Sequence, residues 1–539
     1  MIDVRRWLAS NRPHSRVGAR AHRVGDRLHV QLRRVWPDQA GPFVAALSDE
    51  LADLPVGWID VRLLDCVLVL ALDADARDGV EEDVVGAVEA AESRADVACN
   101  PFPEHRHGAP VEDEPVLRAA AAVAADVFSF GLSVTLRALR APRPPFELDV
   151  EGLVALVQNV PGLRRTFASW VGRGTAEAAA GVAYALVSGG LAQNVVAPVV
   201  GFAYHNLRLG ELRARQEAWL AAEPTMYGPG AAGGSSSEAG ARPLPRPPGP
   251  VERYAEMTWI ASLGTFLATI PLTGSVDRAL GVLASGAPKA ARIGREAFGS
   301  HLSRDLGERG IVVLRPGSLR LLDQIDVVVV EGRLWAGDDA ARLQRVAAAN
   351  GLEVVVVGAP PRRRSGSTAA PVIPVVPAAE GPAEIRRLQI AGRVVATVGG
   401  PGFGPLAAGD LPIGVAGPDG RSPDGSHVIC LGGLPDALRI LNACLPARQA
   451  SRESAHLSLA GALAGVLVAM APAVGTRMPR VLTVVDTAAL VAVGNAVRLA
   501  RQAERCGAGH DPASPQDASA PISLSPPTSR KNGQEAALA

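Results

Sequence analysis

The sequence predicts an α/β protein that also carries membrane helices, and three patterns support that fold class. Strand and helix patterns alternate in a short N-terminal stretch, and long uncharged apolar runs follow it. Later in the chain, short and fully apolar runs alternate with helical segments. The first pattern is typical of a small α+β module, the second of membrane spans, and the third of an open sheet covered by helices.

The composition narrows the class of protein. The chain has 539 residues, of which 54 are basic and 54 are acidic, so its formal net charge is zero. Because no uniform positive field results, no nucleic-acid partner is expected. With 48% hydrophobic and 20% charged residues, the chain is too apolar for a disordered protein and too charged for a bare bundle of membrane helices. Its five scattered cysteines have neither metal-ligand nor redox-motif spacing, so we expect no disulfide framework.

Residues 25–105 predict a ferredoxin-like module. In its first helical segment, apolar residues recur at i, i+4 and i+8, as Phe43, Leu47 and Leu51. The predicted elements are a strand at Arg27–Val35, a helix at Asp38–Leu54, two strands within Val61–Leu72, a helix at Gly79–Arg94 and a last short strand through Val97. The order β-α-β-β-α-β is that of a ferredoxin-like fold.

Long apolar runs are the candidates for membrane helices. They are Ala119–Thr135, Ala178–Tyr204, Met257–Leu272, Leu457–Val474 and Val481–Val497. Because a span needs about 20 mostly apolar residues, we expect about four to six helices crossing the cytoplasmic membrane. The alternative is a set of buried, alanine-rich helices in a soluble protein. Asp126 and Asp486 interrupt two of the runs and would either line an ion path or pair with a neighbouring helix.

Two segments have the composition of flexible chain. Glu223–Val251 is rich in Gly, Ser and Pro and predicts a linker. After Ala508 the sequence has no periodic pattern and predicts a disordered tail. The stretch Met1–Pro37 is Arg-rich and lacks an apolar run, so no cleavable signal peptide is expected.

Residues of about 310–417 predict an open α/β sheet. Strand-like runs occur at Gly310–Leu314, Val327–Val330, Gly351–Val357 and Arg393–Val398, with helical segments at Asp339–Ala349 and Ala383–Leu388. Ligands bind such sheets at the carboxyl ends of the strands. The carboxylate found at such a position is that of Glu331. The glycine-rich Gly399–Gly404 follows another strand and would form either a phosphate cradle or a tight turn.

Two stretches of this domain resemble P-type cation ATPases. The run 310–335, GIVVLRPGSLRLLDQIDVVVVEGRLW, resembles the entry to the phosphorylation domain of that family, and 385–417, IRRLQIAGRVVATVGGPGFGPLAAGDLPIGVAG, resembles its hinge segment. The order of segments from about residue 25 to 505 resembles the amino-terminal half of the large actinobacterial members. The resemblance implies a haloacid-dehalogenase-like (HAD-like, Rossmannoid) domain here and a heavy-metal-associated-like module at residues 25–105.

The family's signature residues are replaced at every motif of this resemblance. The phosphorylated aspartate corresponds to Glu331, and the Lys-Thr-Gly-Thr after it to Gly332, Arg333, Leu334 and Trp335. The hinge-side lysine falls near Pro382. The two magnesium-side aspartates fall on Gly400 and Gly404, and the asparagine on Phe403. The membrane Cys-Pro-Cys corresponds to Ala287, Pro288 and Lys289. Magnesium prefers carboxylate oxygens, which Gly400, Phe403 and Gly404 lack.

The resemblance therefore implies a catalytically degenerate protein. Between Glu331 and Gly400 there is no room for a nucleotide-binding domain of ordinary size, and an actuator domain is not recognisable either. We expect an accessory or regulatory role beside a separate catalytic P-type ATPase, with the lipid bilayer as a second partner and with no cofactor or metal. The alternative is an active pump or a phosphohydrolase that uses Glu331 with ATP and Mg²⁺; a further alternative is a binding scaffold unrelated to ion transport.

Two smaller clusters can each be interpreted either as solvated side chains or as a binding site. His105-Arg106-His107 lies in a Pro-rich connector and is either solvated or a weak metal site. Arg362-Arg363-Arg364 is either a solvated loop or a contact for anionic lipid or nucleic acid.

The predicted boundaries are 1–24 arm, 25–105 ferredoxin-like module, 106–222 membrane helices and connectors, 223–252 linker, 253–305 membrane helix pair, 306–430 HAD-like domain, 431–507 C-terminal membrane helices and 508–539 tail.

Overall fold

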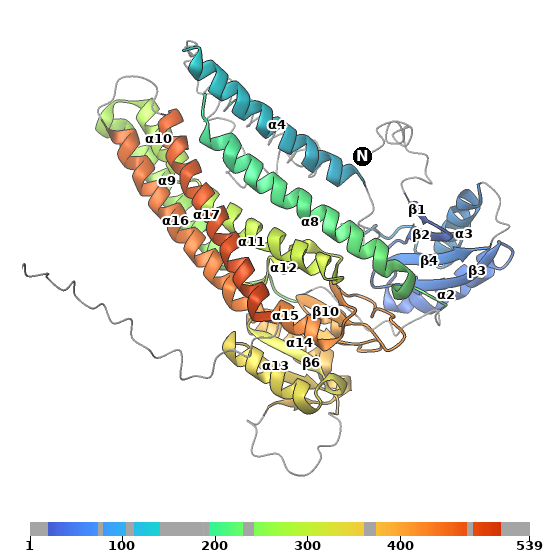
Figure 1. Cartoon of the computed structure of the whole chain (residues 1–539). Coiled ribbons are helices and arrows are strands. Elements are labelled where there is room, and N and C mark those ends of the chain that lie inside the picture. The colour runs from blue at the N-terminus through green and yellow to red at the C-terminus, as the bar shows by residue number, and fades with distance from the viewer. Residues whose placement is uncertain are drawn as a thin grey trace, which may run out of the picture.

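The computed structural model of the chain describes residues 20–73, 79–103, 113–140, 187, 193–229, 242–359, 373–471 and 478–507. Within them, a small N-terminal module lies at one end of a long helix, and an open α/β domain lies at one end of a helical bundle (Figure 1). The histidine cluster at 105–107, the arginines at 362–364, most of the N-terminal arm and the tail at 508–539 lie outside the described residues.

The N-terminal module is a four-stranded antiparallel sheet covered by two helices. Its strands lie in the order β1-β2-β4-β3. Their alternating residues make one hydrophobic core with the helices, in which Leu28, Phe43 and Leu70 are fully buried. The elements are β1 (Ala21–Val24), β2 (Arg27–Gln31), α2 (Pro37–Leu51), β3 (Val56–Arg62), β4 (Val67–Leu72) and α3 (Val80–Arg94).

The edge strand of this module differs from the prediction. The strand expected through Val97 does not form, because the Val97 N–H donates to the carbonyl of Glu92 at the end of α3 (2.7 Å). Instead β1 pairs antiparallel with β2 and occupies the outer position next to it. The ferredoxin-like sandwich is kept, but its outer strand comes from before the first predicted strand, through a tight turn at Gly25 with φ +63°.

The α/β domain is a seven-stranded sheet in the order β5-β11-β10-β9-β6-β7-β8. All neighbours are parallel except β5, which pairs antiparallel with β11. Residues of β6 alternate between two cores, since Val328 and Val330 face one core and Val327 and Val329 the other. The strands are β5 (Val312–Val313), β6 (Val327–Glu331), β7 (Glu353–Val357), β8 (Val375–Val376), β9 (Val395–Gly399), β10 (Leu411–Val415) and β11 (Val428–Cys430).

Short helices connect these strands. They are α12 (Pro316–Leu319), η2 (Gly332–Leu334), α13 (Gly337–Ala349), η3 (Ala378–Glu380), α14 (Gly381–Ile390), η4 (Leu406–Ala408) and α15 (Leu434–Asn442). The predicted alternation of strands and helices is therefore present, with β8, β10 and β11 extending the sheet beyond the four predicted strands.

Long helices form the bundle. They are α4 (Asp113–Ala138), α8 (Val196–Met226), α9 (Pro250–Thr273), α10 (Val276–Ser285), α11 (Lys289–Glu308), α16 (Cys444–Met470) and α17 (Met478–Gly507). Three stretches of the described chain are long and apolar enough to cross a membrane: Pro115–Ala138, Leu434–Met470 and Pro479–Arg505. The run predicted at Met257–Leu272 is helical in α9 but is not among them, and most of Ala178–Tyr204 lies outside the described residues.

The segment predicted as a linker is structured at both ends. At its start, α8 continues to Met226. Near its other end, the Arg242 guanidinium pairs with Asp410 (2.6 Å) and donates to the carbonyl of Arg393 (3.0 Å). The prediction failed there because composition alone does not register these contacts with the α/β domain; residues 230–241 lie outside the description.

Candidate functional site

The sheet changes direction of winding between β6 and β9. The chain runs from β6 outward to β7 and β8, then returns to β9 on the other side of β6 and continues to β10 and β11. In open α/β sheets, the crevice at the carboxyl ends of two such strands is the usual place for a ligand. Because Val330 pairs with Val398, the ends of β6 and β9 stand side by side, and with them Glu331 and Gly400.

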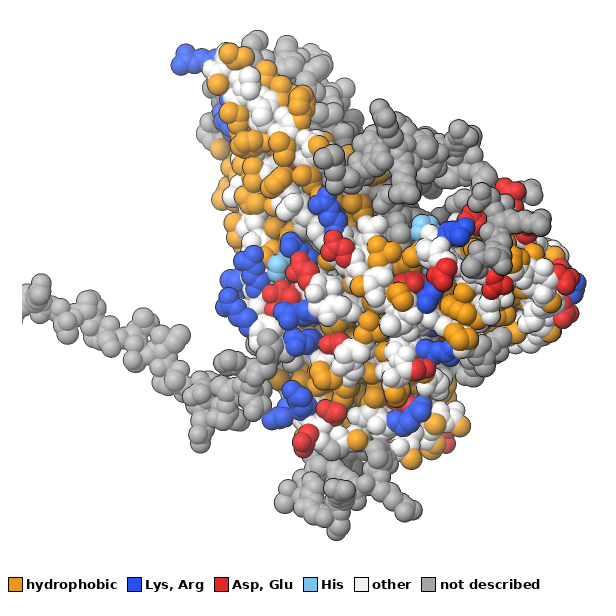
Figure 2. Space-filling model, turned by 45° about the vertical axis from the view of Figure 1, so that its right-hand side comes forward, with side chains coloured by type: hydrophobic (Ala, Val, Ile, Leu, Met, Phe, Trp, Pro, Cys, Tyr) orange, Lys and Arg blue, Asp and Glu red, His pale blue; other side chains and the backbone are white. Residues whose placement is uncertain are grey.

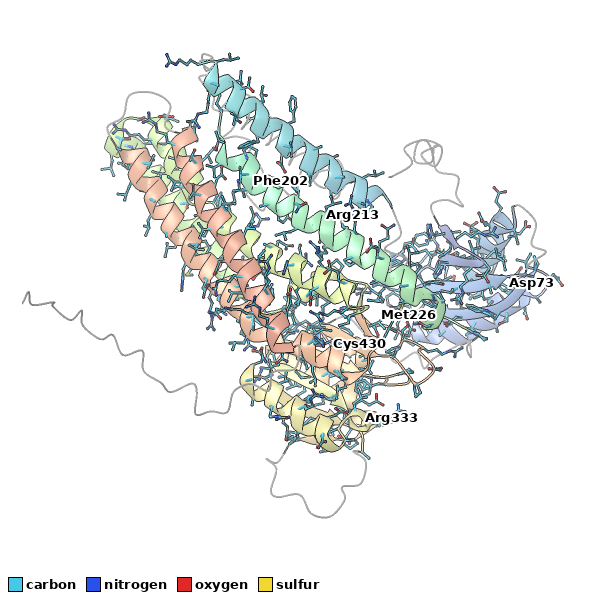
Figure 3. All side chains as sticks on the ribbon, viewed as in Figure 1. Asp73, Phe202, Arg213, Met226, Arg333 and Cys430 are labelled. Atoms are coloured by element: carbon cyan, nitrogen blue, oxygen red, sulfur yellow. The ribbon has the colours of Figure 1, made fainter. Side chains whose placement is uncertain are left out.

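Both oxygens of the Glu331 carboxylate are engaged. The Gly400 N–H donates to Oε2 (2.7 Å), and the Arg333 guanidinium pairs with Oε1. A second nitrogen of Arg333 donates to the carbonyl of Pro401 (3.3 Å), so this side chain bridges the two strand ends at the tip of the α/β domain (Figure 3). Glu331 is only 5% exposed. Glu331 is thus an arginine-paired carboxylate at the end of a strand.

The loop after β9 is folded tightly onto its own strand. The Phe403 N–H donates to the carbonyl of Gly400 (3.1 Å), with Gly402 at φ +83° between them. The buried Phe403 ring lies over Gly399, where an added Cβ would be 2.1 Å from the ring. Gly399–Gly404 thus forms a turn whose interior is filled by an aromatic side chain.

Gly332 is held against the neighbouring loop. A Cβ added to Gly332 would lie 2.6 Å from the Gly358 carbonyl oxygen, so this position carries no side chain without a shift of backbone. It is the position at which the resemblance places a lysine. The loops after β6 and β7 are therefore in close contact here.

The four predicted site positions lie at the same end of the sheet. Glu331 and Gly400 are in direct contact. Pro382 lies in the first turn of α14, next to Gly381, which packs so closely on Pro405 that an added Cβ would lie 2.7 Å from its ring. Gly404 immediately precedes that proline. The sequence therefore predicted which segments converge, although the side chains there are not those of the resembled family.

Metal-ligand groups are not gathered at this end of the sheet. Within the described ranges, no three His, Cys, Asp or Glu side chains lie together as ligands of one ion would. Glu331 accepts a hydrogen bond from a backbone amide on one oxygen and pairs with the Arg333 guanidinium on the other, so a cation bound there would lie beside a positive charge. These residues do not fit a magnesium–nucleotide complex.

A second polar cluster lies between the long helices. Lys289 at the start of α11 pairs with Asp486 of α17 (Nζ to Oδ1, 2.5 Å). The Asn194 amide donates to the other oxygen of Asp486 (3.1 Å), and Asp486 is fully buried. Of the two interpretations of Asp486, pairing with a neighbouring helix is therefore present, and its partner Lys289 was itself singled out from the sequence.

Asp126 is paired in the same way. His205 of α8 contacts it through Nδ1 (2.6 Å), joining α4 to α8. The close approach depends on Gly201, one turn before His205, since a Cβ there would lie 2.4 Å from an Asp126 oxygen. His205 was not predicted from the sequence, although Gly201 and His205 share one helix face with the spacing i, i+4.

A buried ion network that the sequence analysis missed joins the helices to the α/β domain. The Arg320 guanidinium donates to both oxygens of Glu211 on α8 (2.8 and 3.0 Å), and Arg208 donates to the same carboxylate (2.6 Å). Burial alone would raise the pKa of the Glu211 carboxyl, but Arg320 and Arg208 outweigh it and hold that pKa well below its usual range. Arg215 adds a hydrogen bond to the carbonyl of Val313 in β5 (2.7 Å).

Comparison with known proteins points to ion-transporting ATPases. No protein-family model matches the chain. It is 28% identical over 372 residues to "Probable cation-transporting ATPase I" of Mycobacterium tuberculosis (strain H37Rv), covering 60% of this chain and 22% of that protein. The same-named protein of Mycobacterium leprae (strain TN) is 28% identical over 366 residues, covering 59% and 22%.

The chain is homologous to cation-transporting P-type ATPases. It spans about a fifth of the length of the curated relatives it matches. Among solved structures, a zinc-transporting PIB-type ATPase in the E2.Pi state aligns with a TM-score of 0.43 and 12% identity, covering 71% of this chain and 100% of that chain. The similarity to cation-transporting ATPases and the three described stretches that are long and apolar enough to cross a membrane together support a membrane protein.

Proposed function

We propose that this chain is a catalytically degenerate relative of the P-type cation ATPases and serves as an accessory or regulatory unit of a cation-transporting ATPase. In this proposal the chain crosses the cytoplasmic membrane several times, and its α/β domain retains the architecture of a HAD-like phosphorylation domain without its chemistry. The N-terminal module would likewise keep a heavy-metal-associated-like shape without a metal.

The state of Glu331 is the observation that carries the proposal. Phosphoryl transfer requires a free carboxylate oxygen in line with the phosphate, with a cation and a lysine to hold the phosphate charge. In this chain both oxygens of Glu331 are taken by Gly400 and Arg333. To react, Glu331 would have to give up the hydrogen bond from the partly buried Gly400 amide or its ion pair with the exposed Arg333 side chain.

The surrounding positions support the same proposal. Gly332 has no room for a side chain, Phe403 fills the turn where the resemblance places an asparagine, and Gly400 and Gly404 supply no carboxylate. For ATP hydrolysis to proceed, other residues would therefore have to take over three or four independent roles that these positions have in the resembled family.

The experiment is a comparison of phosphorylation and nucleotide binding. The purified full chain is titrated calorimetrically with ATP, with and without Mg²⁺, and then incubated with γ-labelled ATP and quenched in acid. Neither binding nor acid-stable label is expected. Label that requires Mg²⁺ and disappears in Glu331→Gln, but persists in the exposed control Glu353→Gln, would establish the alternative of an active ATPase or phosphohydrolase.

The accessory role has a separate test. The tagged chain is extracted from membranes of a cell that also contains a cation-transporting ATPase resembling the relatives above, and the eluate is analysed for that ATPase. Co-purification at a fixed stoichiometry is expected. Elution of the chain without the ATPase, under conditions in which the ATPase itself remains soluble and active, would contradict the role.

A further inference from the structure

A basic surface lies where α16 and α17 approach the α/β domain. It comprises Arg452 on α16 and Arg498, Arg501 and Arg505 on α17, all of them exposed. The α17 residues follow the spacing i, i+3, i+7 and therefore share one face of that helix. We call these four residues the arginine belt. Figure 2 shows basic side chains gathered between the apolar helical surface above and the α/β domain below.

The two helices place this belt at one level. α16 and α17 are linked by a hydrogen bond from the Asn495 amide to Glu453 (2.5 Å), beside which Arg498 makes a looser ion pair with Glu453 (3.7 Å). Arg452 is the neighbour of Glu453 in the chain, so it lies at the same height along the bundle as Arg498. The belt thus crosses from one helix to the other.

An apolar surface begins directly above the belt. On α16 the exposed residues Leu459, Leu463 and Leu467 follow one another at four-residue intervals, and on α17 Val491 is exposed. Leu459 is seven residues from Arg452, and Val491 is seven residues from Arg498, which corresponds to about 10 Å along either helix. Both helices therefore change from apolar to basic at the same depth, as the boundary between the hydrocarbon core and the headgroups of a bilayer requires.

The belt's positive charge is only partly compensated by acidic side chains. Among the described residues, Arg498 alone of the four has an ion pair or hydrogen bond. Two acidic side chains lie close by and have further partners, because Glu453 binds Asn495 as well as Arg498, and Glu504 pairs with His301 of α11 (3.0 Å) while it also attracts Arg501. By contrast, Arg448, one turn before Arg452 on α16, is bound to the backbone of the α/β domain.

We propose that the arginine belt is a binding surface for the headgroups of acidic phospholipids, at the membrane face next to the α/β domain. The inference rests on the membrane location given above, but not on the state of Glu331. Guanidinium groups bind lipid phosphates through paired hydrogen bonds, and each basic residue near an anionic surface strengthens association by roughly five-fold. The surface would hold the α/β domain at a fixed distance from the leaflet.

The test compares lipid retention. The full chain in neutral detergent is mixed with equal amounts of phosphatidylglycerol and phosphatidylcholine of the same acyl chains, and bound lipid is counted by native mass spectrometry. We expect preferential retention of phosphatidylglycerol by on the order of ten-fold or more. The triple variant Arg452→Gln/Arg501→Gln/Arg505→Gln should lose that preference, and the corresponding Arg→Lys triple should retain most of it, since charge dominates.

A matched control removes three charges at a distance from the belt. Arg342, Arg345 and Arg387 lie on α13 and α14 of the α/β domain, and their replacement by Gln should leave the preference unchanged. Equal retention of the two lipids by the unaltered chain, or an unchanged preference in the belt variant, would overturn the proposal. Extraction of the chain from membranes by alkaline carbonate would instead refute the membrane location on which the proposal rests.

Discussion

Lys289 and Asp486 form the most completely buried ion pair between the long helices. Removing one member of such a pair costs about 3–5 kcal/mol, because the remaining charge is left without compensation. We expect Lys289→Met to lower the thermal unfolding temperature in detergent by several degrees. Lys289→Met/Asp486→Asn should regain part of the loss, since no buried charge then remains, and Lys289→Arg should be close to the unaltered protein. Equal unfolding temperatures for Lys289→Met and the unaltered chain would show that the pair is not formed.

Asp323 gives the α/β domain a pH dependence. Burial raises the pKa of this carboxyl to about 6, against the opposing effects of Arg295 and of a hydrogen bond from the Ser451 hydroxyl (2.6 Å). The usual value is about 3.9, so the folded state binds this proton more tightly than the unfolded state. The proton on Asp323 therefore contributes fully to the free energy of unfolding below about pH 4. This contribution, about 3 kcal/mol, is lost as the pH rises to about 6.

The measurement is a pair of unfolding curves against pH. Asp323→Asn keeps an oxygen that can accept from Ser451 but does not titrate. The variant and the unaltered protein should unfold at nearly the same temperature at pH 4. Between pH 4 and pH 6 the variant should become increasingly more stable than the unaltered protein, and above pH 6 the difference should stay constant. A difference that does not change between pH 4 and 7 would contradict the raised pKa.

At the scale of elements, the turn after β9 is set by contact between Gly399 and Phe403. A Cβ at Gly399 would overlap the ring, and overpacking of this kind costs about 1–3 kcal/mol. We therefore expect Gly399→Ala to be destabilising in a thermal shift measurement. Gly399→Ala/Phe403→Ala should be less destabilised than the sum of its two single variants. In the control Gly86→Ala, on α3, the added Cβ meets nothing within 4 Å, and stability should rise by about 0.5–1 kcal/mol.

The same elements show what the sequence could predict. The apolar runs at Val327–Val330 and Arg393–Val398 were sufficient to place β6 and β9, and with them Glu331 and Gly400 at adjacent strand ends. The edge strand β1 was missed because Ala21–Val24 is four residues long and has no alternating pattern of its own. Its place depends on pairing with β2, which is a tertiary property. His205 and Arg320 were missed for the same reason, since their partners are remote in the chain.

At the scale of the whole molecule, the N-terminal module is fastened to the rest by Arg62. Its guanidinium donates to the Ser422 hydroxyl (2.7 Å) and to the carbonyl of Met226 (2.7 Å), and it lies over the ring of Tyr227. Figure 3 shows Met226 where α8 reaches the module. Nearby, the carboxylate of Asp424 accepts hydrogen bonds from the module's turn between β3 and β4. Arg62 and Asp424 thus act from opposite sides of the junction, beside a second contact in which Arg27 and His29 of the module bind Glu223 of α8 (3.3 and 3.0 Å).

Loss of the arginine should loosen that junction without unfolding either side. Arg62→Ala removes hydrogen bonds to a charged donor that are each worth about 1.5–3 kcal/mol. Opening of the junction should become roughly a hundred-fold more frequent, and amide hydrogen exchange in the 417–427 segment and in the β3–β4 turn should speed up accordingly. Arg94→Ala is the matched control, because Arg94 pairs with Glu50 and Asp49 on the far side of the same module. If exchange at 417–427 rises equally in both variants, the module as a whole is destabilised. If exchange in Arg62→Ala is unchanged, Asp424 and the shared apolar contacts around Trp219 are sufficient to hold the junction closed.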